Sequence, residues 1–311
     1  MKVIDFHCDT ISKLMDNREM SELKSNNFSI DIEKLKNGDN LAQFFALFLN
    51  LKHVKDPLEY CLSMLDKLYM EMKKNEDSIA LVKSYDELIN NKKKNKLSAF
   101  LTIEEGGVLK GELYNLRNFY RLGVRLMTLT WNYPNEIGFP NSKKEYMGKG
   151  LTNFGYQVIE EMNRLHMIID VSHLSDKGFY DVLRLSKRPF VASHSNSRFI
   201  TAHPRNLTDS MIKELSNIGG IMGINFYNRF LGESSISKID DMLLHIKHIY
   251  NVGGIDVIAL GSDFDGIECE VEIKDTSEMY KLQDKLKKSG FSEDNIEKIF
   301  YKNALRIIKD I

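Results

Sequence analysis

Four short segments of the chain end strand-like runs with residue types that bind metal ions. They are His7-Cys8-Asp9, Glu104-Glu105-Gly106-Gly107, His173 within Val171-Ser172-His173, and His194 within Ser193-His194-Ser195. A fifth run, 257–260, leads into Gly261-Ser262-Asp263-Phe264-Asp265. Neutral imidazole and carboxylate suit zinc, iron, manganese or cobalt. Because a (β/α) barrel gathers the carboxyl ends of its parallel strands around one pocket, the pattern predicts one metal centre and a metallohydrolase.

Within these segments the spacing indicates which side chains meet. His7 and Asp9 lie two apart at a strand end and share one side, whereas Cys8 points into the packing. His173 and His194 follow successive runs and are placed to share a second metal ion. The competing interpretations are a buried His–Asp hydrogen bond and two unrelated polar residues in loops.

Two pairs of acidic residues remain ambiguous at this level. A carboxylate at Glu104 or Glu105 is suited to bridge two metal ions, and strand alternation does not choose between them. Glycines after it allow a sharp turn and a close approach to a ligand. Asp263 is suited to act as a general base beside a metal-bound water. Asp263 and Asp265 equally fit backbone caps of a turn.

The elements that must position these residues form a regular series. The chain carries eight β-rich runs, 2–7, 42–49, 97–103, 125–130, 167–172, 189–193, 220–226 and 257–262. Most are continuously apolar, as strands buried on both faces require, and helical patterns separate them. With no low-complexity linker, the series predicts one (β/α)8 TIM-type barrel domain over residues 1–311, with a doubly wound open sheet as the alternative.

Helix signals and long excursions refine this scheme. Asp56-Pro57 reads as a cap and first-turn proline, and Thr208 and Ser237 read as starts of later helices. The residues beyond a compact barrel are expected in the excursions 16–39 and 75–94 and in the loop 131–150.

Composition limits the possible partners. The chain has 311 residues, a formal net charge of -1 and three cysteines without paired spacing. The balanced charge argues against nucleic acid or an anionic membrane as a partner, and the cysteines fit a reducing compartment. The sequence has no apolar run near ~18 residues and starts without a signal-peptide pattern, so we expect a cytoplasmic protein.

Taken together, the motifs resemble those of the renal (membrane) dipeptidase family, a branch of the amidohydrolase-type metal-dependent barrels. The resemblance runs from about residue 5 to residue 305 and also includes Arg205-Asn206. It implies a binuclear zinc site, with His7, Asp9 and Glu105 holding the first ion and Glu105 bridging to a second held by His173 and His194. It also implies that Asp263, rather than Asp265, is the catalytic aspartate and that Arg205 engages the substrate.

The resemblance therefore implies a zinc-dependent dipeptidase that cleaves dipeptides through a metal-bridging hydroxide. A homodimer is a candidate assembly. One departure concerns the fourth strand, where animal members carry a histidine that contacts the substrate carbonyl and this chain has Trp131-Asn132. We expect Trp131 to wall the pocket and Asn132 to supply the donor.

Two rival functions are weaker. Many related amide- or lactone-hydrolysing barrels bridge their metals with a carboxylated lysine on the fourth strand, and the run 125–130 has no lysine. A metal-bearing binding protein without turnover would lack a general base, which Asp263 supplies.

Overall fold

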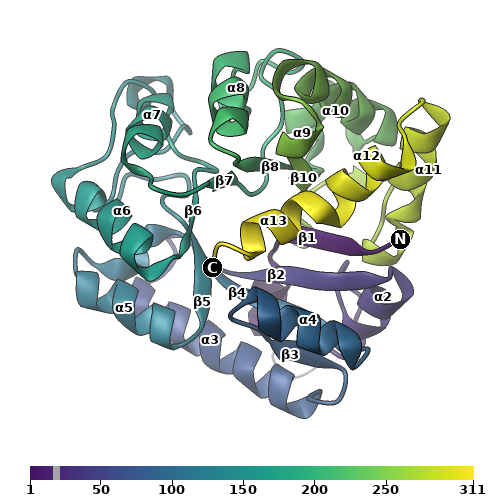
Figure 1. Ribbon diagram of the computed structural model, residues 1–311. Coiled ribbons are helices and arrows are strands. Elements are labelled where there is room, and N and C mark those ends of the chain that lie inside the picture. Colours follow the sequence, from purple (N-terminus) through teal and green to yellow (C-terminus); the bar gives the residue numbers. More distant parts are fainter. Residues whose placement is uncertain (17–21) are drawn as a thin grey trace.

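The computed structural model describes residues 1–16 and 22–311, and within them eight parallel strands close into a barrel (Figure 1). In barrel order these are β1 (Val3–Cys8), β2 (Asn40–Phe48), β4 (Leu97–Glu104), β5 (Val124–Thr128), β6 (Ile168–Asp170), β7 (Val191–Ala192), β8 (Ile221–Ile224) and β10 (Ile258–Leu260). Parallel pairing of β1 with both β2 and β10, and of β2 with β4, closes the ring. Each strand overlaps one predicted run, so the predicted barrel is confirmed and the open sheet is wrong.

Three further short strands lie outside the ring. Strand β3 (Ile79–Leu81) pairs with the beginning of β4 and belongs to the expected excursion 75–94. Strands β9 (Ile236–Ser237) and β11 (Glu270–Val271) form a separate parallel pair. Residues 17–21 of the expected excursion 16–39 lie outside the described residues.

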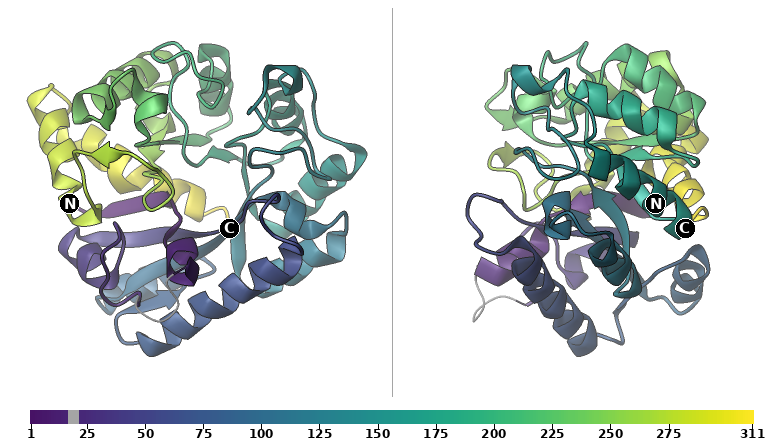
Figure 2. Two further views of the ribbon diagram at one scale, coloured as in Figure 1. Left: turned by 180° about the vertical axis from the view of Figure 1, so that it is seen from behind. Right: turned by 90° about the vertical axis from the view of Figure 1, so that its left-hand side faces the viewer.

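In the two views along the barrel, Figure 1 and the left-hand view of Figure 2, helices surround the strands, and the last helix lies across one end of the barrel. They are α1 (Thr10–Asp16), α2 (Ile32–Asn37), α3 (Pro57–Lys74), α4 (Tyr85–Lys93), α5 (Leu113–Arg121), α6 (Asn153–Leu165), α7 (Asp176–Leu185), α8 (Asp209–Asn217), α9 (Asn228–Leu231), α10 (Ile239–Gly253), α11 (Tyr280–Lys288), α12 (Glu293–Glu297) and α13 (Asn303–Ile308).

The local signals for helix starts hold at two of three positions. The carboxylate of Asp56 accepts hydrogen bonds from the first backbone N–H groups of α3, and the hydroxyl of Thr208 accepts from Met211 N of α8. Ser237 is not a helix cap. It belongs to β9, where its carbonyl accepts from Glu272 N, and α10 begins two residues later.

The closed end of the barrel is apolar. Phe6, Phe44 and Phe100 stack inside it with ring centroids 4.3 and 4.6 Å apart, and all three are fully buried. Ala304 and Ile307 of α13 join this cluster, and the helix crosses this end of the barrel in Figure 1. The packed interior leaves the opposite end, where the strands finish, as the place for a cleft.

Candidate metal centre and substrate cleft

A cleft of about 570 Å³ lies at the carboxyl ends of the strands. Its lining combines acidic, imidazole, amide and aromatic side chains from loops far apart in the sequence. These are Asp9, Asp16, Phe48, Asn50, His53, Glu104, Trp131, Asn132, His173, Tyr227, Phe230, Asp263, Gly266, Ile267 and Glu268.

Glu104 lies at the centre of the polar cluster. Its Oε2 is 3.2 Å from Nε2 of His7, and its Oε1 is 3.1 Å from Nε2 of His173 and 3.4 Å from Nε2 of His194. The side chain is nearly fully buried. One oxygen of this carboxylate therefore faces His7, and the other faces His173 and His194.

Glu105 does not join this cluster, contrary to the expectation that it bridges the metal ions. The last residue of β4 is Glu104, and Glu105 begins a turn with φ of 111° that carries its side chain away. There it accepts hydrogen bonds from Gly107 N, Trp131 N and Asn135 Nδ2. The position next to the histidines belongs to Glu104, and the motif glycines do not distinguish two consecutive glutamates.

The first group of side chains comes from β1 and the end of β10. Nε2 of His7 is 3.4 Å from Oδ2 of Asp9 and 3.8 Å from Oδ1 of Asp263. Cys8 points into the outer packing, as predicted, and its thiol contacts the carbonyl of Phe44 at 3.4 Å. Asn225, directly after β8, donates from Nδ2 to Oδ2 of Asp263 at 2.8 Å, which leaves Oδ1 toward His7.

The second group follows β6 and β7. Nε2 of His173 and Nε2 of His194 are 3.1 Å apart. Their outer nitrogens are held by hydrogen bonds, Nδ1 of His173 to Oδ1 of Asn132 at 3.2 Å and Nδ1 of His194 to the hydroxyl of Ser193 at 2.7 Å. In the form that can bind a metal ion, a proton on each Nδ1 would satisfy these bonds and leave each Nε2 lone pair free for the ion.

Burial and mutual charge control ionisation in the cluster. Burial raises the pKa of Glu104, but the charge of His7 and hydrogen bonds from His173 and His194 outweigh it, so that pKa lies well below its usual range. Burial, reinforced by Asp9 and Glu104, raises the pKa of Asp263 to about 8. Burial and then the charge of Arg205 lower the pKa of His173 to about 4.

The cluster fits metal ions better than a set of internal hydrogen bonds. Both ring nitrogens of His7 and Oδ1 of Asp9 are buried and have no hydrogen-bond partner among the described residues. Ligand atoms of His7, Asp9 and Asp263, and of His7, Glu104 and His194, lie within 4.8 Å of one another. Unpaired buried donors and acceptors are costly, and a cation would satisfy several of them at once.

Arg205 lies beside the second group. Its guanidinium donates to the hydroxyl of Ser195 and, at 3.0 Å, to the carbonyl of His194, while its buried Nε has no partner among the described residues. It also lies over the ring of Phe230, which lines the cleft. These contacts hold Arg205 behind Phe230, and Arg205 itself is not among the residues that line the cleft.

Asp265 has a different role from Asp263. Its carboxylate accepts from the hydroxyl of Thr10 at 2.6 Å and from Ser29 N at 2.7 Å. It therefore connects α1 to the segment before α2 and lies away from the histidines.

Two further residues brace the site and were not predicted. Asp5 accepts from the backbone and hydroxyl of Ser262, and Asp170 accepts from the backbone and hydroxyl of Ser193. Each joins the end of one strand to the next around the ring. The sequence places both aspartates two or three residues before His7 and His173, but their serine partners become visible only in the tertiary structure.

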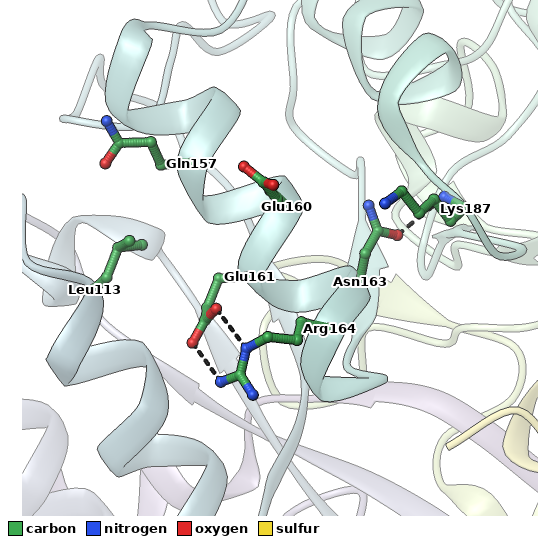
Figure 3. Close-up of a pocket in the computed structure, with 7 residues that line it drawn as sticks. All are labelled: Leu113, Gln157, Glu160, Glu161, Asn163, Arg164 and Lys187. Atoms are coloured by element: carbon green, nitrogen blue, oxygen red, sulfur yellow. Dashed lines mark hydrogen bonds and ion pairs between the residues drawn. The ribbon is translucent and has the colours of Figure 1, made fainter.

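A second hollow, of about 450 Å³, lies between α5 and α6 (Figure 3). Two of its charged side chains pair with each other, since both oxygens of Glu161 accept from Arg164, and the backbone of Lys187 donates to Asn163. Each of the predicted site residues lies outside its lining. The hollow therefore offers no cluster comparable with that at the strand ends.

A family model and curated relatives are similar to this chain in sequence. The model of the membrane dipeptidase family (peptidase family M19) matches residues 1–311. An uncharacterized dipeptidase of Schizosaccharomyces pombe is 32% identical over 302 residues, which cover 90% of this chain and 71% of the relative. An uncharacterized Klebsiella pneumoniae protein from the pqqA 5' region is 37% identical over 219 residues, covering 67% of this chain and 80% of the relative.

Two solved structures superpose closely. A dipeptidase AC, a metallopeptidase of family M19, has a TM-score of 0.92 at 27% identity and covers 100% of this chain and 98% of its own. A Rhodobacter sphaeroides metallopeptidase bound to a phosphinate mimic of the dipeptide L-Ala-D-Ala has a TM-score of 0.90 at 26% identity, covering 100% and 99%.

Among the described residues, each helix is too short or too polar to cross a bilayer. The whole-chain match and the metal-ligand cluster at the strand ends lead to the same assignment. The chain belongs to the membrane dipeptidase family, peptidase family M19, and is a metallo-dipeptidase.

Proposed function

We propose that this chain hydrolyses dipeptides at a centre of two divalent metal ions, zinc in the resting enzyme. The observation that carries the proposal is the placement of Glu104, whose two oxygens face His7 on one side and His173 and His194 on the other. A carboxylate between two imidazole groups is suited to bridge two cations.

In this proposal the ligands divide as the geometry groups them. His7 and Asp9 hold the first ion, His173 and His194 hold the second, and Glu104 is shared. Bound there, the two ions would acidify a water molecule and polarise the peptide carbonyl. Glu104 thus takes the place that the family resemblance assigned to Glu105.

Asp263 is proposed as the proton carrier. Asn225 holds one of its oxygens, and the other faces the cluster, so the carboxylate is oriented toward an attacking water. Nearby cations favour its ionised form, which can accept the proton of that water and deliver it to the leaving amine.

Arg205 and the loop 131–138 are proposed to bind the substrate. A guanidinium next to a residue that lines the cleft, Phe230, is suited to the terminal carboxylate of a dipeptide, because it pairs with both oxygens. Trp131 lines the cleft, and Asn132 presents its amide nitrogen there once its oxygen has accepted from His173. The dipeptide mimic bound by the Rhodobacter relative makes L-Ala-D-Ala a suitable first probe.

Metal content measured together with dipeptide turnover tests the proposal. We expect about two zinc ions per chain and turnover that stops on chelation and returns with zinc. His194→Ala should empty the second position and Asp9→Ala the first, so each variant should retain about one ion. Purified, unchelated protein that carries no divalent metal and binds none on addition would refute the binuclear centre.

A further inference from the structure

The two consecutive glutamates at the end of β4 point in different directions, and the contacts of Glu105 suggest a separate task. Glu105 is fully buried and has no cationic partner among the described residues. Its Oε2 accepts from Trp131 N at 3.0 Å, and its Oε1 accepts from Gly107 N at 2.7 Å and from Asn135 Nδ2. A buried carboxylate with these donors joins its own turn to the loop after β5.

Asn135 extends this connection through the loop. Its amide nitrogen also donates to Leu129 O at 2.9 Å, and its oxygen accepts from Ile137 N and Gly138 N. One side chain therefore ties both ends of the segment 129–138 to Glu105. The loop is held by side-chain hydrogen bonds in place of regular secondary structure.

Close packing between the two segments is a second, independent sign. A Cβ added at Gly106 would lie 2.6 Å from Leu129 O and 2.4 Å from the side chain of Ile137. The glycine after Glu105 thus allows the turn to approach the loop. This explains a glycine that the sequence had associated with ligand approach.

The same loop forms one wall of the cleft and supports the second group of histidines. Trp131 and Asn132 line the cleft, and Asn132 accepts from Nδ1 of His173. Further along the loop, Asn141 N donates to His173 O at 2.7 Å. A shift of the loop would therefore change the substrate wall while the ligands at His7 and Glu104 stay in place.

We propose that Glu105 is a positioning residue that fixes the loop 131–138 over the cleft, so that Glu104 serves the metal ions and Glu105 serves substrate binding. The substrate part of this inference rests on the proposed dipeptidase function. The positional part does not depend on it, because the fold alone supplies the contacts.

The chain supplies a direct probe of the positional part. Trp131 is its single tryptophan, so tryptophan emission reports on this loop alone. Its ring packs against Phe48 at 4.9 Å and Tyr133 at 5.8 Å, and its surroundings change if the loop loosens. Emission wavelength and quenching by acrylamide are the measurements.

Glu105→Gln is the main variant. The amide oxygen would take the Oε1 position, where two donors meet, and its NH₂ group would then oppose Trp131 N. We expect both metal ions to remain, quenching to increase, and the KM for L-Ala-D-Ala to rise about tenfold with kcat changed less than threefold, as for loss of one charged hydrogen bond. Glu161→Gln, which removes a carboxylate from the hollow between α5 and α6, should leave quenching and KM unchanged.

Asn135→Ala provides the second test and covers failure of Glu105→Gln to fold. It should change quenching and KM in the same direction as Glu105→Gln. The changes in the double variant should be only slightly larger than those in the more affected single variant, because both residues hold the same loop. Unchanged quenching in either folded variant would overturn the proposal. Loss of metal from Glu105→Gln but not from Asn135→Ala would also overturn it, by making Glu105 a ligand. A chain without dipeptide turnover would refute the proposed function, while the quenching experiment would still decide the role of Glu105.

Discussion

The metal cluster has two halves, one at β1 and β10 and one at β6 and β7. Similar aspartates brace both halves, but the histidine side chains are held differently. Asp5 and Asp170 each accept from a serine at the end of the neighbouring strand, Ser262 and Ser193. In the second half this serine also accepts from Nδ1 of His194. In the first half neither nitrogen of His7 has a hydrogen-bond partner among the described residues.

The difference indicates a division of labour. In the second half, hydrogen bonds fix the histidine tautomers, and Arg205 is attached to the carbonyl of His194. Such bonds orient metal ligands before the ion arrives. The first half contains the proposed proton carrier, Asp263. We therefore expect changes in the first half to lower kcat and changes in the second half to weaken the binding of substrate or of zinc.

The largest effect should come from Asp263→Asn in the first half. The amide retains the shape and accepts the bond from Asn225, but it cannot take a proton from water near neutral pH. We expect both metal ions to remain and kcat to fall by about 10²–10⁴-fold. Metal analysis and steady-state kinetics on the same preparation measure both quantities.

Asp265→Asn is the matched control for this variant. It makes the same change two residues away, in a carboxylate that accepts hydrogen bonds from Thr10 and Ser29. We expect it to lower the melting temperature and to leave kcat nearly unchanged. An inactive Asp265→Asn with an active Asp263→Asn would reverse the assignment. Loss of metal from Asp263→Asn would make Asp263 a ligand first.

The strand ends show which parts of the site could be predicted from the sequence. Strand runs and their polar ends predicted the barrel and placed His7, His173 and His194 near one another, because both features depend on short-range patterning. The choice between Glu104 and Glu105 depends on where β4 ends and on a residue with φ of 111°, which alternation does not encode. Ser237 failed as a helix cap for a related reason, since a distant strand pairs with it.

The bracing residues required the tertiary structure. Asp170 contacts Ser193 across two strands, and Asn225 contacts Asp263 from the neighbouring strand end. Neither pair has a local spacing that distinguishes it from ordinary turn chemistry. Their roles follow from the closure of the barrel.

Arg205→Ala should have the next largest effect, and it should fall on binding. If the guanidinium binds the terminal carboxylate, its loss should raise KM for free dipeptides by a factor that corresponds to roughly 1.5–3 kcal/mol, while kcat changes less. C-terminally amidated dipeptides should already be poor substrates of the unaltered enzyme and should lose little more. Comparing kcat and KM for the free and amidated forms of one dipeptide measures this. Equal turnover of the two forms by the unaltered enzyme would remove Arg205 from this role.

The smallest effect tests the comparison most directly, through Ser193→Ala and Ser262→Ala. Both serines are buried and donate to a strand-bridging aspartate, at 2.6 and 2.5 Å, so both variants should lose similar thermal stability. Ser193→Ala also removes the acceptor that holds Nδ1 of His194, and it should weaken zinc binding by about 10–100-fold. Ser262→Ala leaves every histidine side-chain contact in place and should change zinc affinity far less. Competition with a chelator measures the affinities, and the melting temperatures of the metal-free proteins check that the two variants are equally perturbed. Equal losses of zinc affinity would show that the two halves are held alike, and the proposed division between them would fail.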